Sequence, residues 1–106
     1  MSVEGIKILV LDRGWVLVGR VSRHPELAFH WRVTDCRCIR LWGSERGLAQ
    51  IAREGPTGQT KLDDPCDLSV PYRAVLQILD VEESKWESHL KSGASGGRQS
   101  GTTRAR

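Results

Sequence analysis

The apolar residues of this chain occur in short runs that have the two-residue period or the β-branched content of β-strands. These runs cover residues 6–11, 15–21, 29–41, 68–70 and 72–81. Some are apolar on both faces, as expected for strands that lie between a barrel interior and a covering helix or a partner subunit. The pattern therefore predicts about five short strands in one small sheet.

Two local features refine the expected sheet. Gly14 ends the short connection formed by residues 12–14 and can supply the positive φ of a hairpin loop, so the first two strands should be antiparallel neighbours. In the third run the apolar face changes from odd to even positions between Val33 and Cys36. A β-bulge or tight bend at residues 34–37 explains this change.

One segment, residues 44–56, has the apolar spacing of a helix, with its stripe beginning at Leu48. Ser44 stands at the expected N-cap, and Gly55 is expected to end the helix. Residues 82–90 could add a helical turn that docks the end of the domain. The predicted fold is mainly β, in the α+β class: a small curved antiparallel sheet or partly open barrel with one short helix.

Residues 1–90 are expected to form a single β-rich domain, and residues 91–106 a flexible Gly/Ser/Arg tail, because the tail has no large apolar residue to bury. The chain has 16 Lys and Arg against 13 Asp and Glu. Four of the basic residues and none of the acidic ones lie in the tail, which leaves 12 basic and 13 acidic residues in the domain. The tail can add weak, salt-sensitive attraction to nucleic acid, although such tails more often keep proteins soluble.

The sequence shows no pattern typical of an enzyme, a cofactor site or a metal site. Cys36, Cys38 and Cys66 lack the paired Cys-x-x-Cys spacing of structural zinc sites. The segment 63–67, with Asp63, Asp64 and Asp67, lacks the alternating ligands of a calcium loop. No motif places a nucleophile beside a base. We therefore expect a protein without catalytic activity, cofactor or bound metal.

A basic surface is the predicted ligand site. Arg32 and Arg40 lie on even positions of the third run together with Trp42, and small barrels bind single-stranded nucleic acid on faces that combine cations with aromatic rings. Ser44 and Arg46 lie at the expected helix N-terminus, where free amides attract anions. A solvated sheet face and an ordinary capped helix are the alternative explanations.

Four tryptophans are many for so small a domain. Either the core is built around them, or one or two of them line an interface. The edges of a small sheet also carry unpaired amides that a second copy of the chain can cover. We therefore expect a homo-oligomer, more readily a dimer than a ring, with Trp15 or Trp31 at the contact.

Residues 35–81 contain a series of turn and helix residues in the order Trp42-Gly43, Arg46-Gly47-Leu48, Ile51-Ala52, Gly55-Pro56-Thr57, Leu62-Asp63, Pro65, Val70 and Ala74-Val75. This order resembles that of a family of small uncharacterised proteins encoded by tailed bacteriophages and prophages. The resemblance implies an origin in a phage or mobile element, and no particular activity. The Gly/Ser/Arg tail is not part of the resemblance.

These observations predict a non-enzymatic binding or assembly protein of phage or mobile-element origin that acts through protein–protein contacts, with itself and with a protein of the phage or its host. The alternative is a small barrel that binds nucleic acid or nucleotides with its basic face and helix N-terminus. The first residues do not read as a signal peptide, and no apolar run approaches the roughly 20 residues of a membrane span. We therefore expect the protein in the cytoplasm, with reduced cysteines and no membrane contact.

Overall fold

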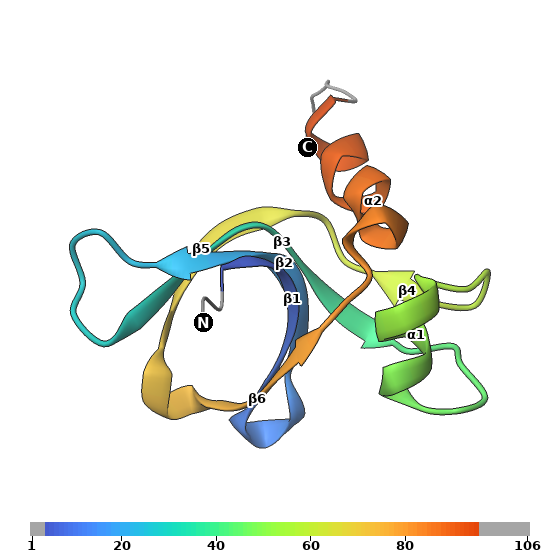
Figure 1. The fold of residues 1–106 in the computed structure, drawn as a ribbon, viewed down its shortest axis with the longest axis horizontal. Coiled ribbons are helices and arrows are strands. Elements are labelled where there is room, and N and C mark those ends of the chain that lie inside the picture. Colours follow the sequence, from blue (N-terminus) through green and yellow to red (C-terminus); the bar gives the residue numbers. More distant parts are fainter. Residues whose placement is uncertain (1–3, 96–106) are drawn as a thin grey trace.

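The computed structural model describes residues 4–95, which form one antiparallel sheet, two α-helices and two short 3-10 helices (Figure 1). The strands are β1 (Gly5–Leu11), β2 (Val16–Arg23), β3 (His30–Leu41), β4 (Lys61–Leu62), β5 (Cys66–Pro71) and β6 (Val75–Asp80). The helices are α1 (Leu48–Glu54), α2 (Glu83–Ser95), η1 (Asp12–Gly14) and η2 (Tyr72–Ala74). The predicted mainly β fold is confirmed, with one more strand and one more α-helix than expected.

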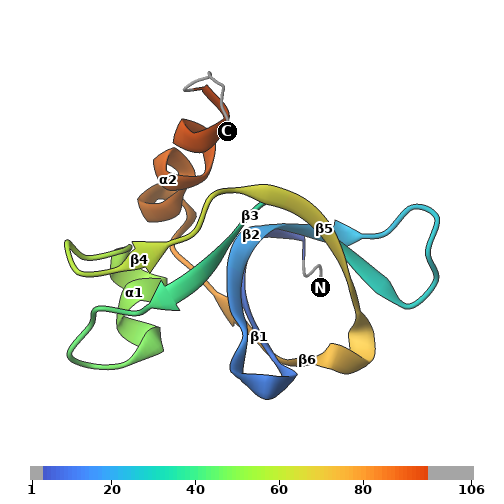
Figure 2. The ribbon, with the colours of Figure 1, turned by 180° about the vertical axis from the view of Figure 1, so that it is seen from behind.

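The sheet has the order β4-β3-β2-β1-β6, and every pair in it is antiparallel. The long strand β3 pairs with β5 along its first part and with β4 near its end. Seen along the shortest axis, β1, β2, β3, β5 and β6 curl into a ring (Figures 1 and 2). Since β5 and β6 are joined by η2 but do not pair with each other, the barrel stays open.

The predicted hairpin and bulge are both present. The hairpin joins β1 to β2 through η1. The pairing of β2 with β3 shifts between Val18 and Arg20, and Asp35 adopts a φ of 51°. Opposite this shift, a Cβ atom at Gly19 would lie 2.7 Å from Cγ1 of Val33, so only glycine allows the two strands this close. Because of the bulge, both Val33 and Cys36 face the same apolar cluster.

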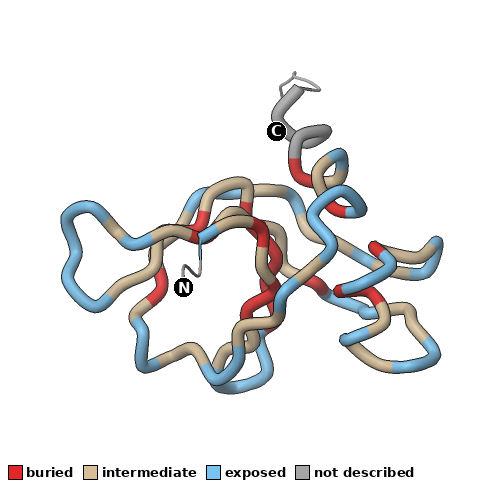
Figure 3. The backbone as a smooth tube through the Cα atoms, viewed as in Figure 1, coloured by how far each residue is buried: buried red, intermediate tan, exposed pale blue. Residues whose placement is uncertain are grey.

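Both faces of the sheet are apolar, as the pattern predicted. The inner face, inside the ring, carries one cluster of buried residues: Leu9, Leu17, Val21, Val33, Cys36 and Val70. The outer face carries a second cluster, in which strand residues meet residues of the two helices: Ile6, Ile8, Val16, Val18, Ile39, Ile51, Ala52, Trp86 and Leu90. Figure 3 shows these buried positions along the strands and at the helices outside the ring. The helices thus cover the outer face, and the curvature of the sheet encloses the inner face.

The N-cap prediction for the short helix is wrong, and its C-terminal end is confirmed. Helix α1 begins at Leu48 after Gly47, which has a φ of 86° and provides no side-chain cap. Ser44 instead donates its hydroxyl hydrogen to the carbonyl of Gly47, at 2.6 Å. The positive φ of Gly47 makes a turn where we expected the first helical turn. At the other end Gly55 has a φ of 89° and donates its amide to the carbonyl of Ile51.

Helix α2 is anchored by Trp86, which is fully buried. Its indole Nε1 donates a hydrogen bond to the carbonyl of Ile51 in α1, at 3.0 Å. The amide of Glu82 likewise donates to the carbonyl of Ala52, at 2.9 Å. The predicted helical turn is therefore a full helix that reaches Ser95, inside the segment that we assigned to the tail. The remainder of that predicted tail, residues 96–106, lies outside the described residues.

We expect Trp86→Ala to lower the free energy of unfolding by about 3–5 kcal/mol, because it leaves a cavity between both helices and the sheet. The matched control is Trp42→Ala, whose side chain is 40% exposed and whose loss should cost about 1 kcal/mol or less. Urea denaturation of the two variants and the parent chain measures both effects. Equal losses for the two tryptophans would contradict the anchoring role of Trp86.

Candidate functional site

The predicted basic surface is neutralised within the domain. Arg40 donates from Nε to the carboxylate of Asp63 at 2.8 Å, and this hydrogen bond together with the charge of Asp63 raises the pKa of Arg40. Arg32 lies 3.9 Å from the carboxylate of Asp67. Both carboxylates come from the acidic residues 63–67, so this segment provides the counter-charges of the basic face of β3. An anionic ligand would have to compete with these ion pairs.

The five predicted ligand residues are also spread over the domain. Arg32 and Arg40 are eight residues apart on β3, roughly 25 Å along an extended strand. Arg46 lies before α1 and pairs with Glu54 at 2.7 Å. Trp42 takes part in a turn in which its carbonyl accepts a hydrogen bond from the hydroxyl of Thr60. Within residues 4–95, three hollows on the domain each have at most one of these five residues in their lining.

Ser44 does not support an anion site at the start of α1 either. Its hydroxyl is engaged with Gly47, as described above. The amides of Glu45 and Arg46 both donate to Oε1 of Gln50, at 3.2 and 2.8 Å. Two of the amides at the expected anion site therefore already have an acceptor.

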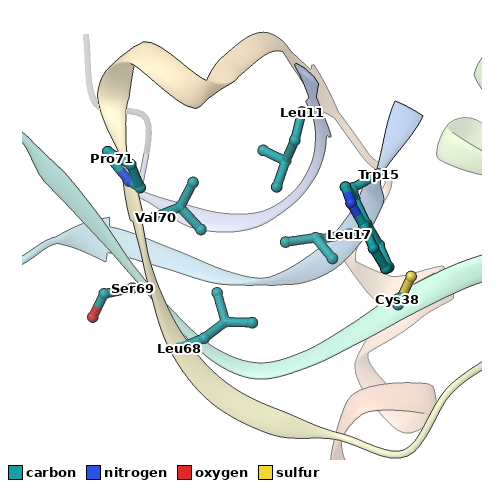
Figure 4. A pocket seen from close by; sticks show the side chains of 8 residues that line it. All are labelled: Leu11, Trp15, Leu17, Cys38, Leu68, Ser69, Val70 and Pro71. Atoms are coloured by element: carbon teal, nitrogen blue, oxygen red, sulfur yellow. The ribbon is translucent and has the colours of Figure 1, made fainter. Parts of the chain in front are cut away.

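The inner face of the sheet contains an apolar cavity of about 410 Å³ that the sequence did not reveal (Figure 4). It lies between the β1–β2 hairpin, β3 and β5, and its lining residues are Leu11, Trp15, Leu17, Cys38, Leu68, Ser69, Val70 and Pro71. None of these side chains carries a charge at neutral pH. Trp15 is 58% exposed, so a large aromatic ring stands beside an apolar hollow. Such a cavity accepts an apolar group.

An aromatic cluster adjoins the cavity. The rings of Trp31 and Tyr72 have centroids 4.6 Å apart, and Phe29 meets Tyr72 edge to face at 6.3 Å. Phe29 is 76% exposed and has a φ of 61°, a conformation that bulky residues rarely adopt. Phe29 and Tyr72 border a second hollow of about 530 Å³, and Pro71 lines both this hollow and the cavity. The two hollows thus meet at Pro71, and the second one also has the polar residues His30 and Arg73 in its lining.

The two predicted interface residues differ in exposure. Trp15 is largely exposed, whereas Trp31 is half-buried and packs against Tyr72 with the two ring planes tilted by 40°. Phe29 and Leu68 were noted in the sequence only as strand residues. The signal that could have singled out Phe29 is its place next to a polar connection, since residues at strand ends protrude.

The three cysteines occupy different environments. Cys36 is buried, Cys38 half-buried and Cys66 exposed, and none is in a disulfide. Burial raises the pKa of Cys36 to about 12, and it also raises the pKa of Cys38. Within residues 4–95 no group of three or more His, Cys, Asp or Glu side chains is placed to hold a metal ion. In the same part of the chain neither helix is long and apolar enough to cross a bilayer.

Comparison with known proteins gives no further identification. Searches with protein-family models and against curated proteins find no match to this chain. The resemblance to small phage proteins therefore stays a prediction.

Proposed function

We propose that this chain is a non-enzymatic binding protein that acts through protein–protein contacts, and that its first partner is a second copy of itself. The observation that carries the proposal is the open apolar cavity with Trp15 exposed beside it. Exposed aromatic rings next to apolar hollows are the usual energetic centres of protein interfaces. With the predicted origin, the protein would serve assembly or binding in a phage-infected or prophage-carrying cell.

The chemistry of the cavity defines what can enter it. Its lining has no charged group, so a charged side chain would lose its hydration without gaining a partner. An aromatic or branched aliphatic side chain would instead bury its surface against Leu11, Leu17 and Val70. The occupant is therefore a large apolar side chain that projects from another protein surface.

Phe29 of a second copy meets this requirement. It projects with 76% of its surface in water, and its backbone holds the unfavourable left-handed conformation. Strained residues of this kind are frequent at functional positions. Since Pro71 borders both the cavity and the hollow beside Phe29, a two-fold axis near Pro71 would bring each Phe29 to the cavity of the other copy. Reciprocal contacts of this kind form a closed dimer.

We expect the chain to sediment as a dimer at micromolar concentration. Phe29→Ser and Trp15→Ser should each weaken the dimer by about 10–100-fold in Kd, because each removes a large aromatic contact. Sedimentation equilibrium over a range of concentrations measures the change.

The matched control is Leu76→Ser in β6, which is 65% exposed and outside both hollows, and should leave the dimer intact. A parent chain that sediments as a single 11.9 kDa species would contradict self-association. An equal effect of Leu76→Ser would mean that the contact lies elsewhere.

Nucleic-acid binding remains the alternative prediction, and the ion pairs of Arg32 and Arg40 make it the weaker one. Exposed pairs of this kind are worth only about 0–1 kcal/mol each, so they reduce the attraction for an anion rather than abolish it. The terminal segment of the sequence adds positive charge through Arg98, Arg104 and Arg106.

We therefore expect weak binding to a single-stranded oligonucleotide that is lost between about 50 and 200 mM salt. Replacing Arg98, Arg104 and Arg106 by Ser should abolish this binding, whereas Arg40→Ala should change it little. Fluorescence anisotropy with a labelled oligonucleotide provides the measurement. Binding that survives the terminal substitutions and disappears with Arg40→Ala would favour the alternative function.

A further inference from the structure

Two cysteines from different strands lie directly opposite each other. Cys36 in β3 and Cys66 in β5 are register partners in the antiparallel pairing of these strands. Opposed residues in antiparallel pairs have Cα atoms about 4.5–5.5 Å apart. This separation falls within the range of about 4.4–6.8 Å that a disulfide can span.

The two side chains also belong to the same face of the sheet. Cys36 is part of the inner apolar cluster, and Leu68 and Val70 of β5 pack in that cluster as well. Cys66 precedes Leu68 by two residues and so shares its face. After burial, the charge of Cys66 is the next largest cause of the raised pKa of Cys36, as expected for neighbouring groups.

The third cysteine does not fit the same geometry. Cys38 pairs with Leu17 of β2, and relative to Cys66 it stands at the diagonal position, two residues beyond Cys36. Diagonal neighbours are about 7–8 Å apart, beyond the reach of a disulfide without backbone movement. The sheet register therefore favours Cys36 over Cys38 as the partner of Cys66.

We propose that Cys36 and Cys66 are a disulfide-forming pair that closes when the chain meets a small disulfide such as oxidised glutathione. The exposed Cys66 thiolate attacks one sulfur of the oxidant, whose S–S bond breaks and releases one glutathione thiolate. Cys36 then loses its proton, attacks the Cys66 sulfur and releases the second glutathione. Two protein thiols are oxidised, and one molecule of oxidised glutathione is reduced to two of glutathione.

The two steps should differ in rate and in pH dependence. At neutral pH very little Cys36 is ionised, because burial holds its pKa at about 12. The thiolate fraction of a group with this pKa rises about tenfold per pH unit in the neutral range. The mixed disulfide on Cys66 should therefore accumulate first, and its conversion to the internal bond should accelerate about tenfold between pH 7 and pH 8.

The bond would change a defined part of the molecule. It closes the segment 36–66, which contains α1 and β4, and it attaches the start of β5 to β3. Constraint of a loop of this size should raise the Tm of the oxidised chain on the order of 10 °C. This inference does not depend on the proposed partner, although β5 also provides one wall of the cavity. In a reducing cytoplasm the bond would form only under oxidising conditions.

Tryptic peptide mapping tests the pairing directly, because Arg37 lies between Cys36 and Cys38. The full chain is incubated with oxidised glutathione, free thiols are alkylated, and the digest is analysed by mass spectrometry. We expect residues 33–37 linked to residues 62–73. A link from residues 38–40 to residues 62–73, or a chain that stops at glutathionylated Cys66, would overturn the proposal.

Three variants complete the test. Cys38→Ser should retain the link, and Cys36→Ala should stop at the mixed disulfide. Cys66→Ser removes an exposed thiol, should leave the fold unchanged, and should abolish both products. If Cys36→Ala does not fold, the loss of the link and of the Tm rise in Cys66→Ser still decides the outcome. Disulfide-linked dimers formed in place of the internal Cys36–Cys66 bond would contradict the proposal.

Discussion

The burial of Trp86 is the contact on which the rest of this small domain depends. A curled sheet of short strands has two apolar faces, and its own curvature covers only the inner one. The outer face needs helices, but α1 has only seven residues and is too short to be stable alone. Trp86 of α2 packs against α1, and its indole donates a hydrogen bond to the carbonyl of Ile51 in α1. Both helices are thereby held on the sheet as one layer.

Local signals predicted the features that depend on backbone geometry. The change of apolar face between Val33 and Cys36 requires a bulge whatever the tertiary context, and the hairpin at Gly14 follows from chain reversal within three residues. The start of α1 was missed because both Ser44 and Gly47 are acceptable N-caps. Tertiary contacts of the preceding turn decide between them. There Gly43 packs so closely on the backbone of Gln59 and Thr60 that no Cβ would fit.

The ion pairs of the predicted ligand residues were missed for a different reason. A sequence shows that cations alternate along a strand, but it does not show which distant loop folds across them. Here the acidic residues 63–67 lie against β3: Asp63 meets Arg40, and Asp67 meets Arg32 and the amide of Asp35. The cations that suggested a basic surface and the acidic residues of this loop are thus the two halves of one set of ion pairs. Their main effect is to fix this loop on the sheet.

A domain of this size has few residues with which to fill its core. This explains both the cavity and the need for the helices. The buried residues of the inner face are Leu, Val and Cys, with the half-buried Trp31 packed against them, whereas the fully buried Trp86 lies in the outer cluster. Medium-sized side chains cannot fill a ring that stays open between β5 and β6. The unfilled volume lies beside Trp15, at the hairpin end of the ring. A domain of this size thus keeps an open apolar hollow where its own residues are too few to complete the core, and in the proposed self-association an apolar side chain of a second copy would complete it.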